Sequence, residues 1–150
     1  MAIYNRTKTV TVPLTVATTA YTQYDVVGGL IEIDVASAGG GGVVGQVQLV
    51  DDHNQKEPYI LYLFREAPTA IADDAAYAPA VGDLVKQCGK VVIAAGHYET
   101  VNSNAWAQVK DLNIWYTTQT GKLYGYLVAQ DTPDYAAAGD LTLIVDVWAD

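Results

Sequence analysis

Few side chains in this sequence are of the types that carry out catalysis. The two histidines are His53 and His97, the single cysteine is Cys88, and the two serines are Ser37 and Ser103. A cysteine nucleophile needs a nearby base and a lowered thiol pKa. Cys88 follows a predicted short helix, and the carbonyl end of a helix raises a thiol pKa instead. Neither serine lies in a nucleophile-elbow pattern, so we predict that the protein is not an enzyme.

Three further segments contain residue types found in ligand sites. Asp51–Asn54 brings carboxylates and a histidine together, but adjacent residues on an extended turn point apart, whereas a zinc site needs converging ligands. Asp73 and Asp74 lack the spaced acids and the glycine of a calcium loop. The run Gly39–Gly42 is not followed by the Lys-Ser/Thr of a phosphate loop. We therefore expect no metal and no cofactor.

Alternation of apolar and polar residues predicts strands along most of the chain. Pro13 falls on the polar side of the first of them, which favours an edge position. A short helix is expected within Ala80–Gln87, between Pro79 and Gly89. The fold class is then all-β, a jelly-roll or related antiparallel β-sandwich with about eight strands and one short helix. The predicted strands span residues 8–16, 30–35, 43–50, 59–64, 90–95, 106–116, 123–130 and 141–148.

The charge is strongly acidic and unevenly distributed. The formal net charge is −9, yet residues 1–24 contain Arg6 and Lys8 and no acidic residue. An acidic surface repels phosphate backbones, which argues against nucleic-acid binding. No apolar run is long enough for a membrane span or a signal peptide, so synthesis in a reducing cytoplasm is expected. We divide the chain into an N-terminal arm or edge strand, 1–20, and a β-sandwich domain, 21–150.

Aromatic residues are abundant, with 11 tyrosines and three tryptophans. Core packing accounts for most of them, but rings opposite an inward-facing side are predicted to be exposed, and these are Tyr4, Tyr116 and Trp148. Exposed tyrosine and tryptophan rings are typical of protein interfaces and of sugar-binding clefts. A carbohydrate-binding module therefore remains an alternative function.

Several segments of turn and strand form a distinctive succession along the chain. They are Asp25–Leu30, Gly39–Gly42, Gln48–Asp51, Tyr59–Phe64, Pro68–Thr69, Asp73–Tyr77, Leu123–Ala129, Pro133, Tyr135 and Asp140–Thr142. From about residue 21 to its end, the chain resembles small proteins of tailed bacteriophages that are often encoded beside the major capsid protein and include head decoration (cement) proteins.

The resemblance implies a structural protein on the outer surface of the phage head, bound to the major capsid protein over joints between subunits. It also implies a homo-oligomer, a dimer or trimer, and it carries over no catalytic residue. A tail or baseplate adaptor is an alternative virion role. We predict that the N-terminal segment makes the contact, by adding a strand to an exposed edge. Its predicted interface residues are Tyr4, Arg6, Lys8, Val10, Val12 and Leu14.

Overall fold

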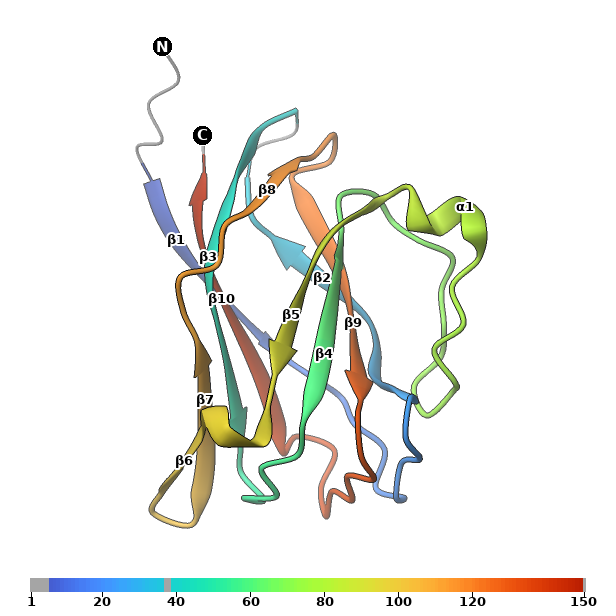
Figure 1. Ribbon diagram of the computed structural model, residues 1–150, viewed down its shortest axis with the longest axis vertical. Helices are drawn as coiled ribbons and strands as arrows, with labels where there is room; N and C mark the ends of the chain where they lie inside the picture. The colour runs from blue at the N-terminus through green and yellow to red at the C-terminus, as the bar shows by residue number, and fades with distance from the viewer. Residues whose placement is uncertain (1–5, 37–38, 150) are drawn as a thin grey trace.

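The computed structural model describes residues 6–36 and 39–149, and the regular secondary structure of this part of the chain is almost entirely antiparallel β-sheet (Figure 1). Residues that are β-branched or aromatic dominate the strands, since these side chains pack well on a pleated surface. The elements in chain order are β1 (Arg6–Pro13), β2 (Val26–Asp34), β3 (Gly41–Asp51), β4 (Tyr59–Phe64), α1 (Val81–Leu84), β5 (Gln87–Ile93), η1 (Ala95–His97), β6 (Tyr98–Val101), β7 (Asn104–Val109), β8 (Ile114–Thr117), β9 (Lys122–Ala129) and β10 (Leu141–Ala149).

Two sheets form a sandwich with the strand order of a jelly roll. The larger sheet has the order β1-β10-β3-β7-β6, with β8 also paired to β3, and the smaller has the order β2-β9-β4-β5. The pairing is nested: β1 pairs with β10, β2 with β9, β3 with β7 and β8, and β4 with β5. An antiparallel ribbon that folds over on itself gives this order. The predicted fold class is confirmed.

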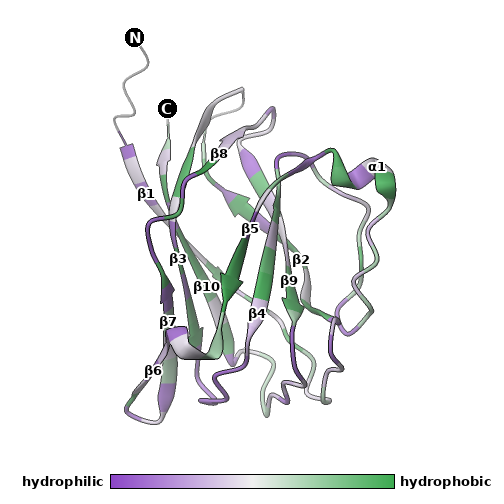
Figure 2. Cartoon of the chain, in the orientation of Figure 1, coloured by the Kyte–Doolittle hydropathy of each residue, from purple (hydrophilic) through white to green (hydrophobic). Residues whose placement is uncertain are grey.

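The main core lies between the two sheets. Alternate residues of β10 and β3 are buried, and they pack against Leu61 and Leu63 of β4 and against Leu123 and Leu127 of β9. Figure 2 shows apolar residues concentrated along these strands, whereas polar residues occupy the loops at the lower end. Burial of apolar area is thus the main stabilising term, as expected for an alternating pattern.

The predicted helix is shorter than expected. Within Ala80–Gln87 only Val81–Leu84 is helical, and Gln87 already pairs with Phe64. Gly89 does not end a helix; it lies inside β5, where a Cβ would approach Ile114 Cγ2 to 2.6 Å. The segment has no apolar face to bury, because Val81 and Leu84 are exposed, so the helix gains little from packing.

The predicted strand 106–116 is two strands. Asp111 has φ 57°, and the chain leaves the extended conformation between β7 and β8. This break reverses which side chains face outward. Trp115 is 58% exposed, whereas Tyr116 is 5% exposed and belongs to the main core. The prediction that Tyr116 is exposed is therefore wrong.

The outer faces of the two sheets differ. Segment 65–80 lies over the outer face of the smaller sheet and closes a second apolar cluster around Phe64 and Tyr126. Tyr77 stacks on Tyr62 at 4.7 Å between ring centroids. In Figure 1 this segment and α1 extend over one side of the molecule, and no comparable segment of the described chain covers the larger sheet.

Candidate interaction surface

The free edge of β1 is the most regular strand edge of the described chain. All eight residues of β1 pair with β10 in one unbroken register. The other edge strands are shorter or irregular: β6 and β8 have four residues each, and β2 and β5 lie in ladders with a register shift. A regular edge presents unpaired backbone groups to any strand that approaches.

The hydrogen bonds of β1 show which backbone groups are unpaired. The amide of Leu14 donates to the carbonyl of Leu141 at 3.0 Å, which makes these two residues a hydrogen-bonded pair. Such pairs alternate along an antiparallel ladder. The N–H and C=O groups of Thr7, Thr9 and Thr11 therefore point away from β10, and Pro13, which has no N–H, falls in the same phase.

The predicted interface residues lie in different environments. Arg6 and Lys8 are exposed at the start of β1. Val10 and Val12 are partly buried and pack against the main core, and Leu14 is 4% exposed within it. Since these three apolar side chains contact the chain's own core, a partner would meet the backbone edge and the two basic residues. Tyr4 lies outside the described residues.

A network of polar side chains crosses the outer face of the larger sheet; we call it the outer ladder. Asp146 of β10 is its centre: it accepts hydrogen bonds from Thr9 of β1, from Gln46 Nε2 at 2.7 Å and from Gln48 Nε2 at 3.4 Å. Gln108 Nε2 donates to Gln46 Oε1 at 2.6 Å, and Trp106 Nε1 donates to Gln48 Oε1 at 2.9 Å. The ladder joins β1, β10, β3 and β7, and its residues are partly buried except for Thr9, which is exposed. Cross-strand pairs of this kind stabilise a sheet and fix its register.

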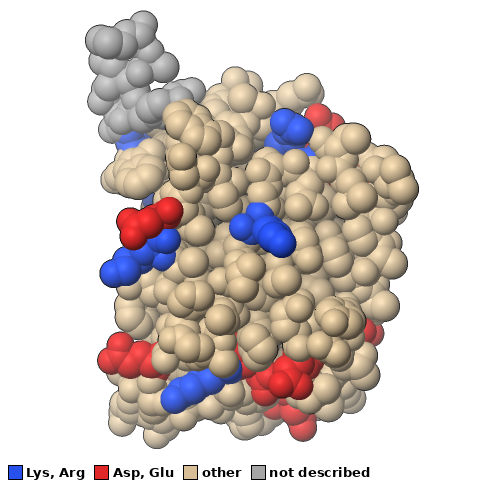
Figure 3. Space-filling model, viewed as in Figure 1, with Lys and Arg blue, Asp and Glu red and all other residues tan. Residues whose placement is uncertain are grey.

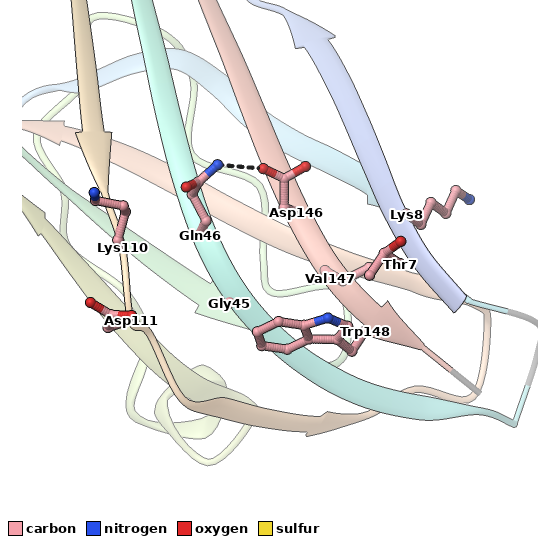
Figure 4. Close-up of a pocket in the computed structure, with 9 residues that line it drawn as sticks. All are labelled: Thr7, Lys8, Gly45, Gln46, Lys110, Asp111, Asp146, Val147 and Trp148. Carbon is pink, nitrogen blue, oxygen red and sulfur yellow. Dashed lines mark hydrogen bonds between the residues drawn. The ribbon is translucent and has the colours of Figure 1, made fainter. Parts of the chain in front are cut away.

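Beside the outer ladder, Trp148 borders a hollow of about 330 Å³, which we call the Trp148 hollow. The register between β10 and β3 shifts after Asp146, so Gly45 has no paired residue. The indole lies across Gly45: a Cβ at that position would come within 2.6 Å of the Trp148 ring. Figure 4 shows the ring flat against β3, with Gln46 and Asp146 next to it. The hollow is lined by Thr7, Lys8, Gly45, Gln46, Lys110, Asp111, Asp146, Val147 and Trp148.

Cys88, the nucleophile considered from the sequence, lies in surroundings that disfavour its reactive thiolate form. Burial raises the pKa of the Cys88 thiol to about 11, and its Sγ lies 3.5 Å from the carbonyl oxygen of Leu63. A protonated thiol is a poor nucleophile. The histidines are engaged elsewhere: His97 accepts a hydrogen bond from the Ala94 amide, and His53 lies 3.9 Å from Asp140.

The two acidic segments considered above, 51–54 and 73–74, each contain a carboxylate that accepts hydrogen bonds from nearby parts of the chain. Asp51 is buried and accepts hydrogen bonds from the amides of His53 and Gln55, at 2.8 and 2.7 Å. Asp73 accepts from the Tyr21 hydroxyl and from the Gly28 amide, both at 2.7 Å. Within the described residues no three His, Cys, Asp or Glu side chains are grouped as metal ligands would be.

Sequence reasoning found some of these features and missed others. Alternation correctly placed Gln46, Gln48 and Trp148 on the outward side of their strands. It did not identify Asp146 as the centre of a network, since this depends on the register between strands distant in sequence. The position of Trp148 over Gly45 depends on the bulge, for which an isolated glycine inside a strand pattern is the one available signal.

Comparison with known proteins gives no match, either to a family model or to a curated sequence. In the described part of the chain, no helix has the length and apolarity needed to cross a membrane.

Proposed function

We propose that this protein is a non-catalytic structural component of a tailed-phage virion that decorates the head and binds the major capsid protein through the free edge of β1. The single observation that carries the mode of binding is the unbroken register of β1, which leaves the backbone groups of Thr7, Thr9 and Thr11 unpaired. The role itself is supported by the resemblance described above. The jelly roll is common among viral capsid proteins, which supports the role by analogy of fold only.

Strand addition fits the chemistry of this edge. An added strand satisfies outward N–H and C=O groups without disturbing the chain's own core. The threonine side chains of the three residues are exposed and small. The edge therefore accepts a partner strand with little steric demand, and specificity would come from residues beside it.

The charge distribution favours the same edge. On the face drawn in Figure 3, acidic atoms gather toward the lower end of the molecule. The loop between β3 and β4, which lies at the lower end in Figure 1, contains Glu57, whose pKa is raised by burial and by the charges of Asp131 and Asp51. Arg6 and Lys8 lie at the opposite end, where β1 begins. A partner with an acidic surface would be attracted to this end and repelled by the other.

The direct test is to block the edge without unfolding the protein. Thr11→Pro removes an outward N–H and places a ring on the free side, in the same phase as the native Pro13. Binding to phage heads that lack the protein is measured by co-sedimentation and by head occupancy. We expect Thr11→Pro to lose most of its binding and Thr11→Val, which keeps the N–H, to bind like the natural protein.

Deletion of residues 2–12 would be less informative, because it also removes Val10 and Val12 from the core. Far-ultraviolet circular dichroism and thermal unfolding verify that the Thr11→Pro protein is folded. Unchanged occupancy by the folded Thr11→Pro protein would refute binding through β1. Failure of the natural protein to bind heads at all would refute the decoration role.

A further inference from the structure

The Trp148 hollow has an aromatic surface held in a fixed position beside polar groups. The ring is 47% exposed and lies on the backbone at Gly45, where no side chain holds it away from the sheet. Its position is therefore set by the backbone of two paired strands. A rigid, half-exposed indole loses little entropy when a ligand stacks on it.

The polar groups around the ring have hydrogen-bonding capacity to spare. Gln46 uses one amide hydrogen for Asp146 and keeps the other. Within the described residues the ammonium of Lys110, the carboxylate of Asp111 and the indole N–H of Trp148 make no hydrogen bond to protein. Donors and acceptors of both kinds thus surround one apolar surface, the arrangement found in sites for small polar ligands.

We propose that the Trp148 hollow binds a neutral hexopyranose, with an apolar C–H face of the sugar stacked on Trp148 and its hydroxyl groups bonded to Gln46 and to the Lys110–Asp111 segment. A pyranose ring has both features that this surface matches: a flat apolar face and a rim of hydroxyl groups. At about 330 Å³ the hollow is at the small end of the range for ligand sites, which suits one sugar ring better than a long chain.

The charges of the lining argue against an anionic ligand. Lys8 and Lys110 are balanced by Asp111 and Asp146, and Lys8 points away from the hollow in Figure 4. Asp146 is held in the outer ladder by three side chains. With no excess of positive charge, the site would not favour a carboxylate, sulfate or phosphate.

This site adjoins the edge used in the proposed function, since Thr7 and Lys8 of β1 line the hollow, but its aromatic surface faces another way. The unpaired backbone of β1 points along the plane of the sheet, whereas Trp148 is on its outer face. A copy bound to a head through β1 would therefore still present Trp148 to solvent. Sugar binding can be tested on the isolated protein and does not require that the decoration role be correct.

The test is a titration of the ¹⁵N-labelled protein with methyl β-D-glucopyranoside, methyl β-D-galactopyranoside and methyl α-D-mannopyranoside, followed by ¹H–¹⁵N correlation spectra. Sorbitol, which has the hydroxyl groups but no rigid apolar face, is the control ligand. We expect at least one pyranoside, but not sorbitol, to shift the Trp148 indole and the Gln46 amide with saturation in the millimolar range. The indole of Trp115 should not move.

Two variants confirm the location. Trp148→Ala removes the ring, and Gly45→Ala keeps the tryptophan but displaces its ring; each should weaken binding by about tenfold or more. Trp115→Ala is the matched control, because it removes another exposed tryptophan of the same sheet, and it should leave binding unchanged. The proposal is overturned if no pyranoside gives a saturable shift, or if the shifts persist in a folded Trp148→Ala protein.

Discussion

The two sheets differ in what covers their outer faces. The smaller sheet carries aromatic side chains on its outer face, and segment 65–80 covers them: the Tyr126 hydroxyl donates to the Thr69 carbonyl at 2.8 Å and accepts from the Ile71 amide at 2.9 Å. The larger sheet has no such cover in the described chain and instead carries the outer ladder. One face is apolar and covered by the chain itself, and the other is polar and open.

This difference indicates where partners can bind. A face that is already covered by its own chain can receive a ligand only if the covering segment moves. An open face made of hydrogen-bonded side chains needs no rearrangement, and the half-exposed ring of Trp148 on this face is available as it stands. Function is therefore expected at the larger sheet, at its β1 edge and on its outer face.

The largest expected effect on stability is the difference between two variants, each of which removes one aromatic ring from the outer face of one sheet. Tyr126→Ala deletes a buried ring that packs edge-on against Phe64 at 5.9 Å, and we expect it to cost about 3–5 kcal/mol of unfolding free energy. Trp148→Ala deletes a half-exposed ring and should cost only about 1 kcal/mol. Urea unfolding of both proteins makes the comparison, and equal costs would show that the two faces do not differ as described.

A smaller effect is expected when the outer ladder is broken. Asp146→Ala removes the acceptor shared by Thr9, Gln46 and Gln48, and should cost about 1–2 kcal/mol. Faster amide exchange at Val10 would report loosening of β1. Asp52→Ala removes the same charge from an exposed loop and should change stability by less than about 0.5 kcal/mol. A cost no larger for Asp146→Ala would mean that the ladder does not stabilise the sheet.

A still smaller change in stability is expected from Gly45→Ala. The new methyl group would displace the far end of the Trp148 ring, whose other face is open to solvent, so the cost should be below about 1 kcal/mol. The fluorescence emission of the protein should nevertheless shift to longer wavelength as the ring becomes more exposed. Unchanged emission and an unchanged Trp148 indole signal would show that the position of the ring does not depend on the absence of a side chain at Gly45.

The last prediction concerns the pH dependence of stability that the partly buried Cys88 thiol contributes. Because burial raises the pKa of Cys88 to about 11, the folded thiol stays protonated above the pKa of an unfolded cysteine, about 8.5. Its contribution to stability is complete below that lower value and is lost as the pH rises through about 11. Iodoacetamide at pH 9 should therefore alkylate the native protein more slowly than the urea-unfolded protein, and equal rates would contradict this protonation state.

The sequence predicts most of the strands and which side chains of each strand face the core. It predicts less well how the strands pair with one another. Alternating residues predicted the all-β sandwich class, with the jelly roll as one option, and the outward position of Trp148. Both depend on the order of apolar and polar residues within single strands, which can be read without knowing the pairing. The break at Asp111 and the bulge at Gly45 were not predicted, because each depends on how β3 pairs with a neighbouring strand. The break at Asp111 is the reason that the exposure of Tyr116 was predicted wrongly. The covered face also escaped prediction: segment 65–80 has no periodic pattern and is held by contacts with Tyr62 and Tyr126.

The central claim is that the chain adheres through the free edge of β1 and keeps the outer face of the larger sheet open. Cryo-electron microscopy of virions that contain the protein measures this directly. We expect density for the sandwich on the head lattice, with β1 against the capsid protein and Trp148 facing solvent. Density confined to the tail, or a head-bound copy with β1 turned to solvent, would contradict it.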